Sequence, residues 1–187
     1  MKILLIDNGS NLLSKLQQLI PGSEVTMKFG DVKLSDTEDF DLIILSGGGF
    51  HNVLQNRGEF QEEIKIIESG KPLIGICFGF ELIAHTFGAK IKKLDTEQVG
   101  THEIEVLDKS LGGPNQVKVY EGHKWGISEL PEVFEVLAKS ASGPEIIKHK
   151  NQPIYGIQFH PENLVEETKG DELFMNLLKQ FLTSSTR

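Results

Sequence analysis

Cys77 is the only cysteine of the chain and lies in the stretch Gly75-Ile-Cys77-Phe-Gly79. An apolar run precedes it and a helical pattern that Gly88 terminates follows, so we expect the cysteine at a turn from strand to helix. Glycines two residues on either side suit the tight backbone of a nucleophile elbow, and a helix start favours the thiolate. The pattern indicates a thiol nucleophile, with a small buried apolar cysteine as the alternative.

A thiol nucleophile needs a general base, and the base needs a group that orients it. Among the six histidines, His160 follows the apolar run 154–159 and precedes Pro161 and Glu162. Residues i and i+2 of an extended segment point to the same side, so the Glu162 carboxylate can lie beside the His160 ring and fix its tautomer. The alternative is a surface turn made of His-Pro-Glu.

Three successive glycines, 47–49, follow the expected strand 41–45 and Ser46. At the carboxyl edge of a parallel strand they leave backbone N–H groups uncovered, where open α/β sheets bind ligands. They could form an oxyanion hole or a phosphate cradle, or they could only relieve backbone strain in a loop.

Neither a cofactor nor a metal ion is expected. The chain has no Gly-x-x-x-x-Gly-Lys-Ser/Thr motif for nucleotide phosphates, and its first strand is not followed by Gly-x-Gly-x-x-Gly. No single element carries a set of metal-ligand side chains at the right spacing, since Glu81 and His85 offer only two ligands.

The elements that must position these residues alternate in the first half of the chain. Short apolar runs predict strands at 3–6, 25–29, 42–45 and 73–77. Apolar residues at i, i+3/i+4 spacing predict helices at 12–20 and 60–67. Alternation of this kind indicates right-handed crossovers and a mainly parallel sheet with helices on both faces.

The second half has a different pattern. Runs separated by turn residues, without convincing helices between them, predict antiparallel strands at 104–107, 117–120, 133–138, 145–148 and 154–159. A final amphipathic helix is expected over 171–182. We therefore expect one α/β domain over 1–187, with a flavodoxin-like three-layer arrangement of a mainly parallel sheet flanked by helices and an antiparallel strand-rich extension.

Composition narrows the class of protein. The chain has 187 residues, of which 39% are hydrophobic and 25% charged, as in ordinary globular proteins. A net charge of −8 disfavours nucleic acid or an anionic membrane as the main partner. No apolar run is long enough to span a membrane, and Asp7 comes too early for the core of a signal peptide. We expect a cytoplasmic protein.

The three motifs, in this order, resemble those of class I (triad) glutamine amidotransferases over almost the whole chain. Within this family the resemblance is closest to the separate glutaminase subunits of GMP synthetases, which share the opening Leu-Ile-Asp7-Asn8-Gly9. The resemblance implies that Cys77 attacks the side-chain amide of glutamine, releasing ammonia and leaving a thioester that water hydrolyses.

The same resemblance assigns further roles. His160 would act as base and then acid, oriented by Glu162, while the backbone N–H groups of Gly48 and Phe78 would hold the oxyanion. Because no ATP-binding motif is present, a separate ATP-dependent synthetase would have to use the ammonia in the synthesis of GMP, a purine nucleotide.

The chain departs from the family at substrate-binding positions. Glu81 stands where the family has Gln, and Gly122-His123-Lys124-Trp125 stands where related GMP synthetases have Ser-His-x-Asp. Glu81 could pair with a substrate ammonium in place of the acid that Trp125 replaces, or it could simply be tolerated. Two alternatives to a glutaminase follow: a stand-alone thiol hydrolase of another γ-glutamyl amide or peptide, and a non-catalytic binding module.

Overall fold

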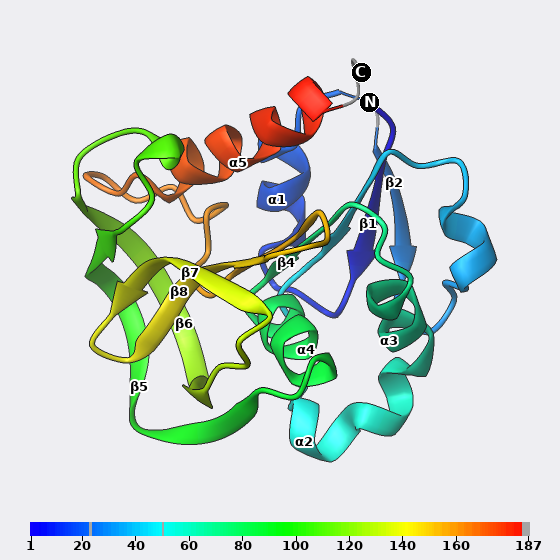
Figure 1. The fold of residues 1–187 in the computed structure, drawn as a ribbon, viewed down its shortest axis with the longest axis horizontal. Helices are drawn as coiled ribbons and strands as arrows, with labels where there is room; N and C mark the ends of the chain where they lie inside the picture. Colours follow the sequence, from blue (N-terminus) through cyan, green and yellow to red (C-terminus); the bar gives the residue numbers. More distant parts are fainter. Residues whose placement is uncertain (23, 50, 185–187) are drawn as a thin grey trace.

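The computed structural model describes residues 1–22, 24–49 and 51–184, and its strands form one mixed sheet (Figure 1). The strand order across the described residues is β2-β1-β3-β4-β9-β8-β7-β5-β6. The first five strands in this order run parallel: β2 (Glu24–Lys28), β1 (Ile3–Asp7), β3 (Leu42–Leu45), β4 (Leu73–Ile76) and β9 (Ile154–Ile157). The predicted parallel half of the sheet is thus present.

Helices cover both faces of the parallel half. The helices α1 (Leu13–Leu19) and α5 (Gly170–Ser184) pack on one face, and α3 (Gln61–Glu68) and α4 (Phe78–Thr86) pack on the other. Along β1, Ile3 and Leu5 join the first core while Leu4 and Ile6 join the second. A strand buried on both faces must be apolar throughout, which explains the uninterrupted apolar runs in the sequence.

The antiparallel extension consists of β5 (Lys90–Val106), β6 (Gln116–Glu129), β7 (Phe134–Ser140) and β8 (Gly143–His149). The β5–β6 ribbon is far longer than the predicted strand at 104–107, and its register shifts between Lys93 and Gln98. Most of the added part of β5 is exposed or only partly buried. Its sequence therefore lacks the apolar run by which a strand is recognised.

The strand β9 joins the two halves of the sheet. We predicted it among the antiparallel strands, and that prediction is correct only on one side: β9 pairs antiparallel with β8 but parallel with β4. Because β4 and β9 run the same way, the residues that follow them, Cys77 and His160, come to the same edge of the sheet.

Short elements complete the chain: α2 (Val53–Asn56), and the 3₁₀ helices η1 (Leu34–Thr37), η2 (Arg57–Phe60) and η3 (Lys109–Leu111). None of them was predicted, because three or four residues carry no periodicity. Within the described residues, no helix is both long and apolar enough to cross a membrane. The expected class, a mainly parallel α/β sheet with an antiparallel extension, is confirmed.

Candidate active site

Cys77 occupies a strained turn between β4 and α4. Its backbone has φ 50° and ψ −103°, a positive φ that residues with a side chain rarely adopt. A Cβ on Gly75 would lie 2.4 Å from the carbonyl carbon of Gly79, and a Cβ on Gly79 would lie 2.6 Å from the carbonyl oxygen of Leu45. Both flanking glycines are therefore required by close backbone packing, as a nucleophile elbow demands.

His160 and Glu162 form the expected pair. The His160 Nδ1 atom lies 2.9 Å from Glu162 Oε1, and the Glu162 side chain is buried. The His160 backbone N–H donates to the carbonyl of Tyr120, which fixes the loop after β9 against β6. Because the carboxylate accepts a hydrogen bond from Nδ1–H, Nε2 is left as the reactive nitrogen of the ring.

The His160 ring fits between two glycines. A Cβ on Gly47 would lie 3.2 Å from His160 Cε1 and 3.7 Å from the Cβ of Cys77. A Cβ on Gly122 would lie 3.3 Å from His160 Cδ2. The glycine run and β6 thus leave room for the imidazole beside the thiol.

The thiol and the imidazole influence each other's protonation. Burial raises the pKa of Cys77 above its ordinary value, while the charge and hydrogen bonding of His160 oppose the rise. Burial by itself lowers the pKa of His160, but Cys77 and Glu162 outweigh it and raise that pKa well above its ordinary value. A thiolate at Cys77 would therefore be stabilised by the neighbouring imidazolium, and Cys77 stands at the start of α4, where a helix N-terminus favours a negative charge.

Cys77 opens into a pocket of about 410 Å³. Most of the other residues singled out in the sequence line it as well: Gly48, Phe78, Glu81, Gly122, His123 and Trp125. A smaller pocket of about 220 Å³ shares Gly48, Cys77 and Gly122 with the first and is also lined by His160. The structure brings all of the sequence-predicted site residues together around one thiol.

The Glu81 side chain is buried in the pocket wall, and this burial changes its protonation. It is 4% exposed, and burial raises its pKa to about 7, with the charge of His123 and contact with Gln158 limiting the rise. At neutral pH a large fraction of Glu81 is therefore a protonated carboxyl, which can donate as well as accept a hydrogen bond. In that form it resembles the amide side chain that the family has at this position.

Five further residues in the pocket wall carry no signal of their own in the sequence: His51, Asn52, Gln55, Lys93 and Lys124. Lys93 lies on β5 where the register with β6 shifts, and Lys124 lies on β6 between His123 and Trp125. Lysines in polar stretches give no local indication of function, so only the pairing of β5 with β6 reveals them.

Comparisons with known proteins agree with the fold and identify the family. The family model described as "Glutamine amidotransferase class-I" matches residues 4–180. Because that match spans nearly the whole chain, the chain belongs to the class I glutamine amidotransferase family.

Individual relatives within this family are more specific than the family model. One subunit of the glutamine-hydrolyzing GMP synthase of Pyrococcus abyssi is 33% identical, with 95% of this chain and 97% of the relative covered. A glutamine-hydrolyzing GMP synthase of Neisseria meningitidis is 30% identical over 94% of this chain, which spans 35% of that longer relative. The crystal structure of a Thermoplasma acidophilum protein assigned to GMP synthase has a TM-score of 0.88 at 29% identity, covering 99% of this chain and 96% of the other.

Proposed function

We propose that this chain hydrolyses the side-chain amide of glutamine and supplies the ammonia to a separate ATP-dependent synthetase, in the manner of the GMP synthase subunits that it resembles. The observation that supports the proposal most directly is Cys77 on its elbow, beside a His160 ring that Glu162 orients. Its relatives also include a longer glutamine-hydrolyzing GMP synthase, of which this chain spans about a third.

The reaction proceeds in two halves. Cys77 transfers its proton to His160, and the sulfur attacks the amide carbon of glutamine to give a tetrahedral oxyanion. The backbone N–H groups of Gly48 and Phe78, both in the pocket wall, hold this oxyanion. His160 then protonates the leaving nitrogen, ammonia departs and a γ-glutamyl thioester remains. Water, deprotonated by His160, hydrolyses the thioester to glutamate and restores the thiol.

The resemblance to the family supports a role in substrate binding for four residues that line the pocket. Glu81, Gly122, His123 and Trp125 would contact the amino-acid end of the substrate, while the reacting amide lies at Cys77. A free thiol persists more readily in a reducing compartment, which supports the cytoplasm as the proposed location.

The test uses a glutamine-derived diazo ketone, which alkylates a thiol in a glutamine site. One label per chain on Cys77, ammonia release from glutamine, and loss of both in Cys77→Ala would support the proposal. Ammonia release by Cys77→Ala at the unaltered rate would overturn it. Addition of a GMP synthetase that lacks its own glutaminase should couple glutamine hydrolysis to GMP formation.

A second candidate, hydrolysis of another γ-glutamyl amide or peptide, is favoured by Glu81 and Trp125. These two residues change the hydrogen-bonding character of the pocket, while the chain keeps Cys77, His160 and Glu162 at the positions that the mechanism needs. A screen of γ-glutamyl amides and dipeptides against glutamine, ranked by kcat/KM, distinguishes the two candidates. A preference for glutamine with or without the synthetase would exclude the second.

A further inference from the structure

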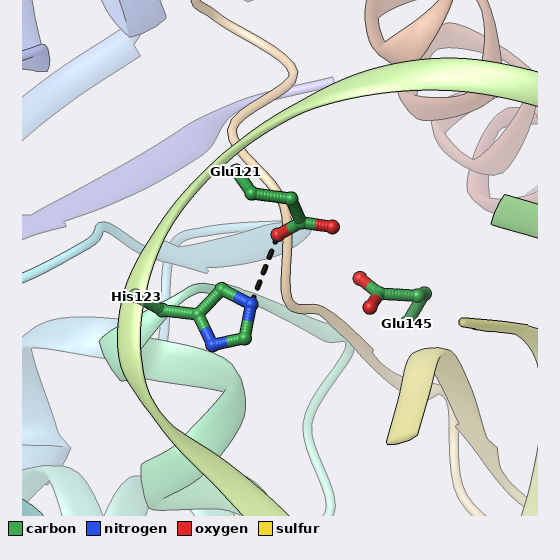
Figure 2. Close-up of side chains that lie close together, drawn as sticks. All are labelled: Glu121, His123 and Glu145. Atoms are coloured by element: carbon green, nitrogen blue, oxygen red, sulfur yellow. Dashed lines mark ion pairs between the residues drawn. The ribbon is translucent and has the colours of Figure 1, made fainter. Parts of the chain in front are cut away.

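A second group of titratable side chains lies beside the active-site pocket. Glu121 and His123 are two residues apart on β6 and so point to the same side, and Glu145 reaches them from β8. One ligand atom from each of the three lies within 4.8 Å of the others. Figure 2 shows the three side chains pointing toward a common space between the strands.

These three side chains are buried with little to balance their charge. Glu121 and Glu145 are each 1% exposed and His123 is 5% exposed. Among the described residues, His123 is the only cationic group recorded in an ion pair with either carboxylate, with its Nε2 atom 3.1 Å from Glu121 Oε2. Two carboxylates out of water cost several kcal/mol each unless a cation or a proton compensates them.

Several polar atoms in the cluster have no partner in hydrogen-bonding geometry. In the described part of the chain these are both oxygens of Glu121, Oε2 of Glu145 and Nε2 of His123. The great majority of buried polar atoms in proteins are hydrogen-bonded, so four such atoms in one buried cluster require an explanation. All four atoms are of the kind that donates a lone pair to a metal ion.

The atoms on the outer side of the cluster are, by contrast, held in place. His123 Nδ1 donates to the backbone carbonyl of Trp125 at 2.7 Å, so Nε2 faces the carboxylates. The Ser140 hydroxyl donates to Glu145 Oε1 at 2.6 Å, and Ser142 lies 2.7 Å from Ser140. A histidine that ligates a metal usually donates its other N–H to a carbonyl or carboxylate in this way, and ligating carboxylates are likewise hydrogen-bonded.

We propose that Glu121, His123 and Glu145 bind one divalent transition-metal ion, with Zn²⁺ as the best fit. Two carboxylates balance the charge of the ion, and one imidazole with carboxylate oxygens is a usual ligand set for Zn²⁺ at about 2.0–2.2 Å. The imidazole disfavours Mg²⁺ and Ca²⁺, which prefer oxygen ligands. The sequence predicted no metal because the third ligand lies on another strand, beyond the reach of a spacing rule.

Protons are the competing occupants of the cluster. Burial and the charge of Glu121 raise the pKa of Glu145 well above its ordinary value. Burial lowers the pKa of His123, but contact with Glu121 outweighs this and raises it. A metal ion must displace these protons, so its binding competes with protonation of the cluster.

The ion would fix the wall of the active-site pocket. His123 lines that pocket, and its neighbour Gly122 lies against the His160 ring, whereas Glu121 and Glu145 are absent from the described lining. A bound ion would tie β6 to β8, two strands that are in contact but are not neighbours in the sheet. It would position His123 without touching the reacting thiol. Only this effect on catalysis rests on the proposed function, while metal binding itself does not.

The test measures Zn²⁺ binding to the full chain after removal of metal with a chelator. The Cys77→Ala background is used, because Cys77 and His160 could bind Zn²⁺ themselves, and the absence of turnover separates this test from that of the proposed function. We expect one ion per chain by calorimetry and elemental analysis, and a rise in Tm with excess Zn²⁺. Glu121→Gln and Glu145→Gln, each added to this background, should weaken binding at least ~10-fold to 100-fold.

Glu105→Gln in the same background is the matched control, since Glu105 lies on the neighbouring strand β5 and pairs with Lys139 at the surface. It should bind Zn²⁺ as tightly as the Cys77→Ala chain. The proposal would be overturned if the Cys77→Ala chain did not bind Zn²⁺, or if Glu121→Gln and Glu145→Gln both left the affinity for Zn²⁺ unchanged. Shared protons would then be what compensates the buried carboxylates. Because the first measurement needs no change in the cluster, a variant that does not fold leaves the proposal testable.

Discussion

At the scale of single residues, activity depends on where one proton lies between Cys77 and His160. Burial raises the pKa of the thiol, as do the charges of Glu81 and Glu162, whereas the imidazole of His160 lowers it and so favours the thiolate. His160→Ala should therefore lower kcat/KM for glutamine by about 10²- to 10⁴-fold, as loss of a general base does. Glu162→Gln should cost less, because the amide still holds the ring but stabilises the imidazolium poorly.

Steady-state ammonia release measures these losses, and the rate at which the diazo ketone alkylates Cys77 reports thiolate formation separately. His102→Ala is the matched control: His102 lies on β5, outside both pockets, and bonds the carbonyl of Val99. A fully active His160→Ala together with an inactive His123→Ala would transfer the role of base to His123.

A second prediction concerns Glu81 and the dependence of its protonation on pH. With its pKa raised to about 7 by burial, Glu81 is mostly a neutral carboxyl at pH 6 and mostly a carboxylate at pH 8. Only the neutral form can donate a hydrogen bond as glutamine does. If glutamine is the substrate, Glu81→Gln should change kcat/KM little at pH 6 and raise it roughly 5- to 150-fold at pH 8, since a lost buried partner costs ~1–3 kcal/mol.

The pH profiles of kcat/KM for both proteins decide this prediction. Equal profiles would show that Glu81 does not set specificity. A γ-glutamyl substrate that places an ammonium or other donor against the carboxylate should instead be hydrolysed less well by Glu81→Gln at pH 8.

The sequence could predict the site residues that carry a local signal, and not those that depend on burial or on distant strands. Cys77 has its flanking glycines, and Glu162 follows His160 at the spacing that an extended segment requires. The protonation of Glu81 depends on burial, which no motif encodes. Glu145 joins Glu121 and His123 because two non-adjacent strands approach each other, a tertiary effect.

At the scale of elements, the close packing of α4 on the sheet positions the nucleophile. A Cβ on Gly79 would lie 2.6 Å from the Leu45 carbonyl oxygen and 2.8 Å from the Leu45 Cβ, so that α4 would have to move away from β3. We expect Gly79→Ala to lower the free energy of unfolding by about 1–3 kcal/mol, as overpacking does, and to remove activity by displacing Cys77. Urea unfolding and ammonia release measure the two effects.

Gly30→Ala is the control for this change, because no atom lies within 4 Å of its Cβ position and its backbone does not have a positive φ. Its stability should stay within about 0.5 kcal/mol of the original. A fully stable and active Gly79→Ala would mean that α4 is not held as closely to β3 as the structure shows.

Elements were predictable where one face or both faces are apolar. The parallel strands and α4 and α5 follow from apolar runs and 3.6-residue periodicity. The length of β5 does not, because most of that strand pairs only with β6 and exposes polar side chains. The direction of β9 relative to β4 is set by packing across the sheet, so the local sequence of β9 could not reveal it.

At the scale of the whole molecule, a carboxylate is buried at the end of the parallel sheet. Glu63 on α3 is fully buried, and neither of its oxygens has a hydrogen-bond partner in the described part of the chain. Burial raises its pKa to about 8, an effect that the nearby Asn8 only partly opposes. The folded chain thus holds this proton more tightly than the unfolded chain does.

This difference makes stability depend on pH in a definite direction. The contribution of the Glu63 proton is fully present below the ordinary pKa of 4.5 and is lost as the pH rises through about 8. Glu63→Gln, which cannot ionise, should therefore match the original chain near pH 4.5 and become more stable above pH 8. The gain should be on the order of 3–5 kcal/mol, because one pKa unit corresponds to about 1.4 kcal/mol. Urea unfolding of both chains from pH 4.5 to 9 measures the difference, with Glu105→Gln as a surface control whose difference should stay near zero across the range. A constant difference between Glu63→Gln and the original would mean that Glu63 is not the group that titrates.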